Sequence, residues 1–468
     1  MSEKIEGRVN ASGTGVEGHA IVIGGSMAGL LAAQVLTEHF QRVTVVERDH
    51  FPDEPAARKG VPQARHIHIL LVRGQRILSR FFPDLARDMV AAGATRVTWS
   101  TDAAMLLTTG WAPHYQSDLV SYVCSRDLLD WLIRCRLAQN PRLCFVQGHQ
   151  ATSLLTTADK RRVTGVSLRP VGETSSTYSH LEADLVVDAS GRSSRLPQWL
   201  EALGYEPPPE STINAYLGYA SRWYEQPADF VGGWKAALVL ARSPHLPRGG
   251  GLLPAEDGRW LVTLAGYGGD YPPTDEADFV AFARSLASPI LYDAIRAAAP
   301  LSSISGYRRT QNRLRHYERL RDLPEGVVAL GDAVCAFNPV YGQGMTVSAL
   351  AALTLDACLQ QRPGRDVTGL ARRFQRRLAQ TNQIPWLLAT GEDFRWPTTT
   401  GGQPNWTTRL AHRYIEHVLD LIPTDWRISR TFFEVTHLVR HPAALFHPAI
   451  ALRVLPRLLS RRKAYVNQ

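Results

Sequence analysis

A glycine-rich segment near the start of the chain has the residue types and spacing of a phosphate-binding turn. The apolar run at 20–23 is typical of a strand buried on both faces, and it leads into Gly24, Ser26 and Gly29. A helix is expected directly after the turn, and its first N–H groups and dipole suit an anion. Glu47 ends the next buried strand, about 20 residues beyond the turn, where a carboxylate can accept hydrogen bonds from a ribose. The segment therefore predicts a βαβ unit that binds a dinucleotide.

The turn departs from the G-x-G-x-x-G pattern at its middle position, where Ser26 replaces glycine. Serine is small, so close approach of a phosphate to the backbone is strained but not excluded. Strand, turn, helix, strand and terminal acid all follow in order, which favours a nucleotide site over a βαβ unit without a ligand.

Other reactive side chains give weaker patterns. His66 and His68 have no acidic or cysteine partner nearby, so we expect loop or pocket histidines and no metal site. The basic pair Arg58 and Lys59 is expected to face the cofactor or the mouth of a pocket. Five cysteines without a C-x-x-C or zinc spacing indicate reduced thiols, as in the cytoplasm.

Composition narrows the class of protein. The 468 residues carry a net charge of +9, but the basic residues are scattered and no nucleic-acid motif is found. No apolar run reaches the length of a membrane span, and the first twenty residues do not resemble a signal peptide. These features predict a soluble enzyme that acts on a small molecule.

The elements that must position these residues form an α/β fold with an α+β insert. Buried strand patterns at 43–47, 183–188 and 326–330 predict a Rossmann-like parallel sheet, whereas 143–146, 151–155 and 163–168 predict an attached meander. Alternating patterns predict a mostly antiparallel sheet in a second domain. The expected organisation is a disordered leader (1–19), a discontinuous nucleotide-binding domain (20–95, 124–206 and 311–360), a substrate-binding sheet domain (96–123 and 207–310) and a C-terminal helical region (361–468).

Several separated motifs together resemble one known family. They are the turn with Glu47-Arg48, the loop from Arg58 to His66, Ser125-Arg126, the segment from Asp184 to Gly191, and Gly331-Asp332-Ala333 followed by Asn338 through Met345. In this order they resemble the flavoprotein monooxygenase superfamily with the hydroxybenzoate-hydroxylase-like fold. Within it the chain is most similar to actinobacterial polyene epoxidases of polyether biosynthesis, and the likeness extends from about residue 18 to 360 and, more loosely, to the C-terminal helices.

The resemblance implies FAD as the cofactor. It places the pyrophosphate at the first turn, the adenosine ribose at Glu47, the phosphate or ribityl region at Arg126 and the ribityl chain at Asp332. The loop that ends in Gly344 would approach the isoalloxazine ring, where a helix dipole can stabilise negative charge. The cofactor-binding residues implied are Gly24, Ser26, Met27, Ala28, Gly29, Glu47, Arg48, Arg58, Lys59, Gly60, Arg126, Ala151, Gly331, Asp332, Pro339, Gly342, Gly344 and Met345.

The same resemblance implies a reaction. Reduced FAD would form a flavin hydroperoxide and epoxidise an alkene of an apolar polyketide-type substrate in secondary metabolism. The cofactor carries this chemistry, so no side chain is assigned a catalytic role. The protein must supply a dry pocket, and its expected walls are His66, Trp234, Tyr267 and Phe337.

Two alternatives stay open. Decalin-forming flavin cyclases resemble the same branch, and they use FAD to shape a pocket for a non-redox [4+2] cycloaddition of a polyene. The electron donor is also open, because Ser190-Gly191 stands where many hydroxylases have Asp-Gly, a motif linked to NAD(P)H handling. NAD(P)H or a separate flavin reductase would supply the electrons of an oxygenase. The W-x-W-x-I-P motif of flavin halogenases is absent.

Overall fold

The computed structural model describes residues 18–172, 178–361 and 366–459. The predicted leader at 1–19 therefore lies outside the described residues, except for Gly18 and His19. His19 already begins the first strand, because its backbone N–H is fixed by the Asp184 carboxylate at 2.8 Å.

The nucleotide-binding part is built on a parallel sheet of five strands in the order β19-β11-β1-β2-β7. Its β1, β2, β11 and β19 contain the buried apolar runs expected of central parallel strands. The predicted meander differs in one respect, because β7 pairs in parallel with β2 and belongs to this sheet. The bounds are β1 (His19–Ile23), β2 (Arg42–Val46), β7 (Leu143–Val146), β11 (Leu185–Asp188) and β19 (Val327–Ala329).

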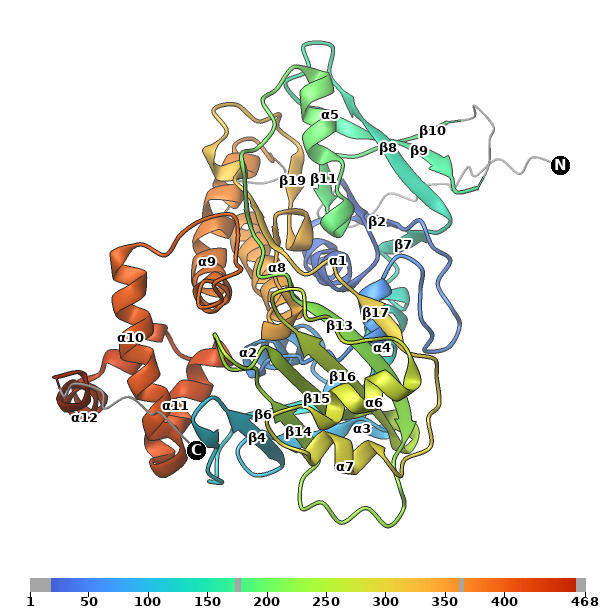
Figure 1. The fold of residues 1–468 in the computed structure, drawn as a ribbon. Coiled ribbons are helices and arrows are strands. Elements are labelled where there is room, and N and C mark those ends of the chain that lie inside the picture. Colours follow the sequence, from blue (N-terminus) through green and yellow to red (C-terminus); the bar gives the residue numbers. More distant parts are fainter. Residues whose placement is uncertain (1–17, 173–177, 362–365, 460–468) are drawn as a thin grey trace.

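Helices cover this sheet and hold its loops (Figure 1). The first helix, α1, is rich in alanine and leucine, and it is buried where it packs on α8. Helix α4 begins at a capped end, because the Ser125 hydroxyl accepts a hydrogen bond from the backbone N–H of Leu128. The bounds are α1 (Met27–His39), α2 (Val72–Phe81), α3 (Leu85–Ala91), α4 (Arg126–Ala138), α5 (Leu196–Leu203) and α8 (Gly344–Gln360).

A three-stranded antiparallel sheet in the order β10-β9-β8 is attached to the parallel sheet. Its start is fixed beside the nucleotide-binding part, because the backbone N–H of His149 donates to the carbonyl oxygen of Glu47. The bounds are β8 (His149–Thr156), β9 (Val163–Pro170) and β10 (Ser179–Glu182).

The second large sheet has seven strands in the order β17-β13-β16-β15-β14-β4-β5. It is antiparallel except where β4 pairs in parallel with β14, and this pairing brings residues of 96–123 and 207–310 into one sheet. Helices α6 and α7 pack over one face around buried Trp260 and Phe279. The bounds are β4 (Ala103–Leu107), β5 (Gly110–Trp111), β13 (Gly218–Glu225), β14 (Ala236–Val239), β15 (Arg248–Pro254), β16 (Arg259–Gly266), β17 (Ser305–Tyr307), α6 (Glu276–Arg284) and α7 (Ile290–Ile295).

Two small sheets and several 3-10 turns join these parts. One pairs β3 (Thr95–Thr98) with β6 (Val120–Val123), and the other has the order β12-β18-β20. The remaining bounds are β12 (Glu210–Ile213), β18 (Asn312–Arg315), β20 (Cys335–Ala336), η1 (Pro62–Arg65), η2 (Gly191–Ser193), η3 (Glu256–Gly258), η4 (Tyr317–Arg319), η5 (Gly331–Ala333), η6 (Pro339–Tyr341), η7 (Ile422–Thr424) and η8 (Pro442–Phe446).

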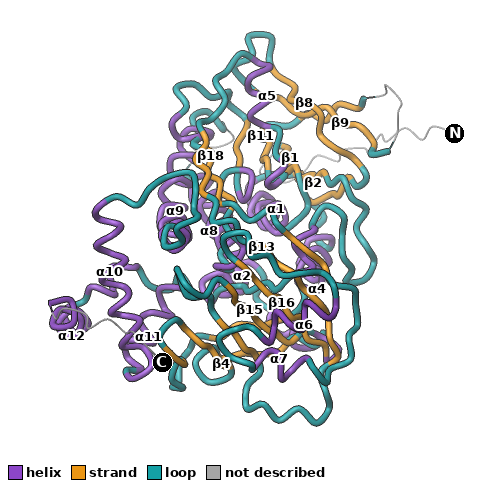
Figure 2. The backbone as a smooth tube through the Cα atoms, viewed as in Figure 1, coloured by secondary structure: helices purple, strands orange, loops and turns teal. Residues whose placement is uncertain are grey.

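The C-terminal region is helical and lies along one side of the molecule (Figure 2). Helix α9 packs on α8, whereas α10 and α11 share a hydrophobic cluster with β4. No helix in the described parts of the chain is long and apolar enough to cross a membrane. The bounds are α9 (Leu370–Asp393), α10 (Trp406–Leu421), α11 (Trp426–Thr436) and α12 (Pro448–Leu459).

The tight packing of α1 on the turn predicts the cost of adding one methyl group. A Cβ at Gly29 would lie 1.8 Å from the carbonyl oxygen of Gly24, so Gly29→Ala must displace the helix from the strand. We expect it to lower the free energy of unfolding by about 1–3 kcal/mol in urea denaturation. Gly391→Ala in α9 is the matched control, because a Cβ there would have its nearest neighbour, Nε2 of His412, at 3.8 Å. The control should gain up to about 1 kcal/mol from helix propensity, and equal effects of the two changes would contradict this account.

Candidate functional site

The turn after β1 brings a helix start and a carboxylate together. Gly24 has φ +102°, and a Cβ there would lie 2.6 Å from the carbonyl oxygen of Ala189. The hydrogen-bond ladder of α1 begins with the N–H of Leu30 donating to Ser26 O, so the N–H groups of Met27, Ala28 and Gly29 have no acceptor within the helix. This is the arrangement in which a phosphate is bound by backbone donors and the helix dipole.

Glu47 closes this turn from the end of β2. This residue is 6% exposed, and its Oε2 accepts a hydrogen bond from Gly25 N at 2.7 Å while Oε1 accepts from Asp49 N at 3.0 Å. The loop after β2 folds back toward the end of this strand, because Gly60 N donates a hydrogen bond to Asp49 Oδ2 at 2.6 Å. The carboxylate predicted to bind a ribose is therefore held rigidly at the turn.

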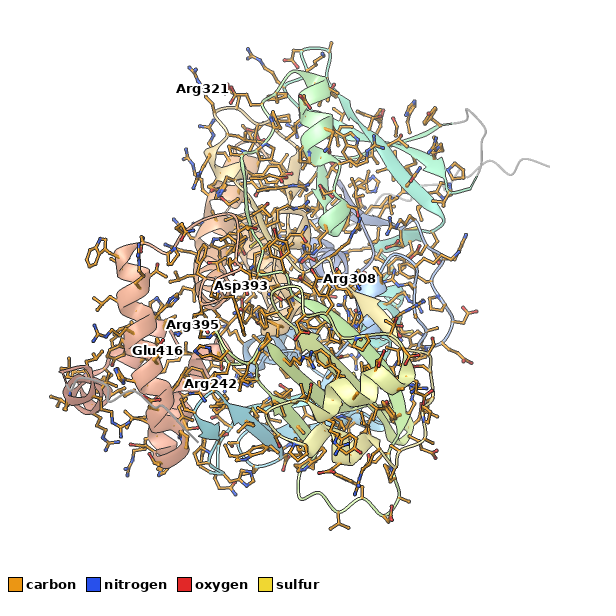
Figure 3. All side chains as sticks on the ribbon, viewed as in Figure 1. Arg242, Arg308, Arg321, Asp393, Arg395 and Glu416 are labelled. Atoms are coloured by element: carbon orange, nitrogen blue, oxygen red, sulfur yellow. The ribbon has the colours of Figure 1, made fainter. Side chains whose placement is uncertain are left out.

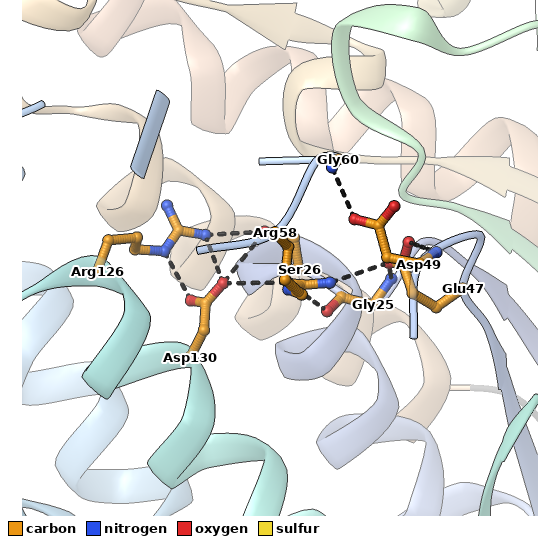
Figure 4. Close-up of polar contacts among 8 residues, drawn as sticks. All are labelled: Gly25, Ser26, Glu47, Asp49, Arg58, Gly60, Arg126 and Asp130. Atoms are coloured by element: carbon orange, nitrogen blue, oxygen red, sulfur yellow. Dashed lines mark hydrogen bonds and ion pairs between the residues drawn. The ribbon is translucent and has the colours of Figure 1, made fainter. Parts of the chain in front are cut away.

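Two buried arginines lie beside the helix start (Figure 4). Arg126 donates from Nε to Asp130 Oδ1 at 2.6 Å and from Nη2 to Ser26 Oγ at 2.9 Å. Arg58 approaches the same Asp130 from the other side at 3.4 Å and donates to Gly25 O at 3.1 Å. The serine that replaces the middle glycine therefore accepts a hydrogen bond from a predicted phosphate-binding arginine.

The polar groups here fit an anionic ligand. Arg58 Nη1 is buried and has no hydrogen-bond partner among the described residues, and it is paired only with Glu47 Oε2, 3.4 Å away. A pyrophosphate would satisfy such a donor together with the helix N–H groups. A small hollow adjoins the cluster and is lined by Gly25, Leu30, Phe51, Pro52, Ala56, Arg58, Val61, Asp127, Asp130, Trp131 and Arg134.

Asp130 was not among the residues singled out from the sequence. Its position four residues after Arg126 places both on one face of α4, and this spacing was the available signal. Burial, together with the negative charge of Asp130, raises the pKa of the neighbouring Asp127 carboxyl to about 6. Burial and the charge of Arg126 lower the pKa of His68 to about 3, so this histidine stays neutral beside the cluster.

The second predicted motif meets the first at α1. Gly331 has φ +62°, and a Cβ there would lie 2.6 Å from Cβ of Ala28. The neighbouring Asp332 is partly exposed, and its carboxylate lies 3.9 Å from Nε of Arg192. Arg192 in turn donates to the carbonyl oxygen of Phe337 at 2.6 Å. The turns after β1, β11 and β19 therefore converge on one edge of the parallel sheet, as ligand sites of such sheets do.

The third motif leads into α8. Gly342 has φ +63°, a conformation that favours glycine, and Gly344 begins the helix with open space where a Cβ would be. Gln343 Oε1 and Thr346 Oγ1 are buried without a hydrogen-bond partner among the described residues. Unsatisfied polar atoms at a helix start are what a ligand with polar ring atoms would complete.

The four predicted pocket residues lie in different packing environments, and their role in a pocket stays a prediction. His66 is buried, with Nδ1 2.7 Å from Ser221 Oγ and its ring 5.4 Å from that of Tyr307. Tyr267 stacks on Trp396 with ring centroids 4.3 Å apart. Trp234 packs against Phe230 and Trp260, in the cluster that includes α6 and α7, and Phe337 is part of the core around the parallel sheet.

The structure also locates the remaining predicted cofactor residues. Ala151 lies in β8, two residues beyond the contact of His149 with Glu47. Lys59 is exposed. The Arg48 side chain packs against Gly60, since a Cβ at Gly60 would lie 3.2 Å from Nε of Arg48. Met27 and Met345 are buried in the first turns of α1 and α8, and Pro339 begins η6. These roles stay predictions, because the contacts fix positions and not ligands.

Comparison with known proteins identifies the family. A family model described as "FAD binding domain" matches residues 17–361. Protein Rv3254 of Mycobacterium tuberculosis is 35% identical over 423 residues, which cover 88% of each chain. A kynurenine 3-monooxygenase of Salinispora tropica is 27% identical over 397 residues, or 80% of each chain.

Solved structures share the fold at low sequence identity. The flavin-dependent brominase Bmp2 superposes with a TM-score of 0.63 at 13% identity, covering 90% of this chain and 93% of its own. A flavoprotein/dehydrogenase from Cytophaga hutchinsonii gives a TM-score of 0.64 at 15% identity, covering 94% and 98%. The α/β fold with its nucleotide-binding sheet, second sheet and C-terminal helices therefore matches that of flavoproteins.

Arg126 gives a direct test of the phosphate site. Arg126→Gln keeps a polar side chain but removes the charge that a pyrophosphate would meet, and we expect FAD to bind about 10- to 100-fold more weakly. The dissociation constant is measured from quenching of flavin fluorescence. Arg136→Gln on the same helix is the control, because Arg136 pairs with Asp88. Equal affinities of the wild type and Arg126→Gln would remove Arg126 from the site.

His66 predicts a pH dependence. Burial, with the charge of Arg65, lowers the pKa of His66 to about 4, whereas an unfolded histidine titrates near 6.5. The unfolded chain alone takes up this proton in the interval, so the free energy of unfolding falls as the pH drops from about 6.5 to 4, by up to about 3 kcal/mol.

His66→Gln should remove this part of the pH dependence, because glutamine does not titrate. Urea denaturation at several pH values gives the slope for each protein. The exposed His245→Gln is the control for the loss of a histidine as such. A slope for His66→Gln equal to that of the wild type would show that His66 is not buried in neutral form.

Proposed function

This chain belongs to the FAD-binding domain family, and from that premise we propose that it is an FAD-dependent monooxygenase that epoxidises an alkene of an apolar, polyketide-type substrate. The family model covers residues 17–361, and the predicted cofactor motifs lie within that range. The name kynurenine 3-monooxygenase, carried by two relatives at 27% and 26% identity, supports an oxygenase reaction and not its substrate.

One observation carries the proposal, namely that the second sheet presents an aromatic wall next to the predicted flavin-binding aspartate. Tyr307 ends β17, and burial raises its pKa, while the charge of Arg192 lowers it and that of Asp332 raises it, so both charged groups act on this hydroxyl. The ring of His66 lies 5.4 Å from Tyr307 and 6.0 Å from Tyr219. A substrate between this wall and a bound flavin would meet aromatic rings and a neutral imidazole.

These groups suit an apolar alkene. When bound and reduced, FAD would supply two electrons that activate molecular oxygen, so that one oxygen atom is transferred to a double bond and the other leaves as water. The chain must exclude water and hold the alkene in place. Burial holds the pKa of Tyr219 well above its ordinary value and lowers that of His66, so both stay uncharged near neutral pH. The likeness to halogenases is one of fold alone, and the sequence lacks the halogenase motif.

The electron donor is proposed to be NAD(P)H acting directly or through a separate flavin reductase in the cytoplasm. At the position of the Asp-Gly motif, Ser190 Oγ donates to Asp188 Oδ1 at 2.5 Å, and Ser190 N donates to the same oxygen at 3.0 Å. The serine thus turns toward its own strand end. Because no carboxylate stands at position 190, the motif linked to NAD(P)H handling is incomplete, and we favour a separate reductase as the electron donor.

The proposal is tested with purified protein loaded with FAD. The flavin is reduced without oxygen, either by dithionite or by NADPH, and then mixed with ¹⁸O₂ and a linear polyene. We expect a product that has gained one labelled oxygen atom, observed by mass spectrometry, and we expect dithionite to be more effective than NADPH alone. Protein with oxidised FAD and no reductant is the control.

The outcomes distinguish an oxygenase from a non-redox cyclase. Labelled epoxide only from the reduced protein supports the oxygenase. A product of unchanged mass from oxidised protein overturns it in favour of the non-redox cyclase. Protein that does not bind FAD would contradict both.

A further inference from the structure

A buried carboxylate at the end of α9 lies outside the stretch that the family model matches. Asp393 is the last residue of α9, and its side chain is 0% exposed. The matched residues end at 361, so this carboxylate belongs to the C-terminal helical region. Figure 3 shows Asp393 near the middle of the molecule, where side chains of several elements converge.

Three side chains donate hydrogen bonds to this carboxylate. Asn312 of β18 donates from Nδ2 at 2.6 Å, Asn338 from Nδ2 at 3.1 Å, and Tyr341 from its hydroxyl at 2.6 Å. Asn312 also accepts from the backbone, because Asn338 N donates to its Oδ1 at 2.7 Å. Two of the three donors therefore belong to the loop at 338–344, which runs from β20 into α8.

The same network reaches the second sheet. Tyr267 follows β16, and burial raises its pKa above the ordinary value, while the charge of Asp393 raises it further and a side-chain hydrogen bond with Tyr341 lowers it. On its other side Tyr267 stacks on Trp396, three residues beyond Asp393. A single carboxylate thus joins the second sheet, the loop at 338–344 and the C-terminal helices.

The charged carboxylate of Asp393 is costly to bury. None of the ion pairs found among the described residues includes Asp393, so neutral donors alone compensate its charge. Burial raises its pKa to about 6, whereas the hydrogen bonds from Tyr341, Asn338 and Asn312 lower it. The titratable side chains that act on it or respond to it are Tyr341, Tyr267, Tyr219 and Glu392. An apolar residue would pack here at lower cost, but it could not fix the directions of three donors.

We propose that Asp393 is a positioning residue for the flavin: it holds the loop at 338–344 so that this loop and the start of α8 receive the isoalloxazine ring. The inference rests on FAD occupying the site, but it holds for an oxygenase and for a cyclase alike. It makes the C-terminal region part of the cofactor site, although the residues that touch FAD are predicted to lie within 17–361.

The decisive variant is Asp393→Asn, which keeps the shape but replaces one acceptor oxygen with an amide donor that opposes the donors around it. We expect FAD to bind at least about tenfold more weakly, and the visible spectrum of the bound flavin to shift. Circular dichroism and thermal unfolding of the same proteins report whether the fold is retained. Glu392→Gln is the matched control, because the neighbouring Glu392 is 47% exposed and pairs with Arg395.

An exchange of the two groups distinguishes positioning from general damage. In the double variant Asp393→Asn with Asn338→Asp, the amide at 393 can donate to a carboxylate at 338, so the pair is restored in reverse. We expect most of the lost FAD affinity and the wild-type flavin spectrum to return. Tyr341→Phe removes one donor and leaves the charge in place, and it should weaken FAD binding about threefold to tenfold.

The outcomes separate this proposal from the proposed function. Wild-type affinity and spectrum in folded Asp393→Asn would overturn the positioning role while the monooxygenase proposal stands. If Asp393→Asn does not fold, Tyr341→Phe decides, and a folded Tyr341→Phe with wild-type affinity and spectrum would overturn it too. A wild-type protein that binds FAD but transfers no oxygen would contradict the reaction and leave the role of Asp393 intact.

Discussion

The site depends on how closely α1 approaches the end of β1. Gly29 lies against the backbone of Gly24, where even a Cβ would be only 1.8 Å from the carbonyl oxygen. This contact directs the free N–H groups at the start of α1 to the edge of the sheet. Glu47 and Arg126 then reach the same point from β2 and α4, and Ala28 packs against Gly331 in the turn after β19. If α1 were displaced, Glu47, Arg126 and Gly331 would no longer meet the turn and the start of the helix at one place.

Much of this arrangement could be predicted from the sequence, because the signals are local. Buried runs such as 20–23 and 326–330 predicted the parallel strands, and the spacing of Gly24, Gly29 and Glu47 predicted the βαβ unit. The assignment of β7 to the meander was wrong, because four residues, three half-buried and one exposed, do not reveal whether their neighbour is parallel or antiparallel. The substrate wall was harder still, since an aromatic residue in a pocket and one in a core have the same appearance in a sequence.

Hydrogen bonds to buried charged side chains explain what the sequence could not show. Ser26 breaks the glycine pattern, yet its hydroxyl accepts from Arg126, which Asp130 also orients. Asp393 is separated by 52 residues from Tyr341, and only the fold brings them together. In both cases a buried charge has a hydrogen-bond partner that is distant in the chain. Such groups determine one arrangement at some cost in stability, which is an expected property of functional sites.

The path of the chain through the parallel sheet has a consequence for biosynthesis. Strand β19 at Val327–Ala329 pairs with β11, but five of the seven strands of the second sheet, β13 to β17, are encoded between them. A ribosome must therefore deliver the whole second sheet before the edge that carries Asp332 can close. Contacts between such distant segments form slowly because long loops must be ordered first. The early strands β1, β2 and β11 have to wait with one edge unpaired, and exposed edges of this kind are where chaperones act and where aggregation begins.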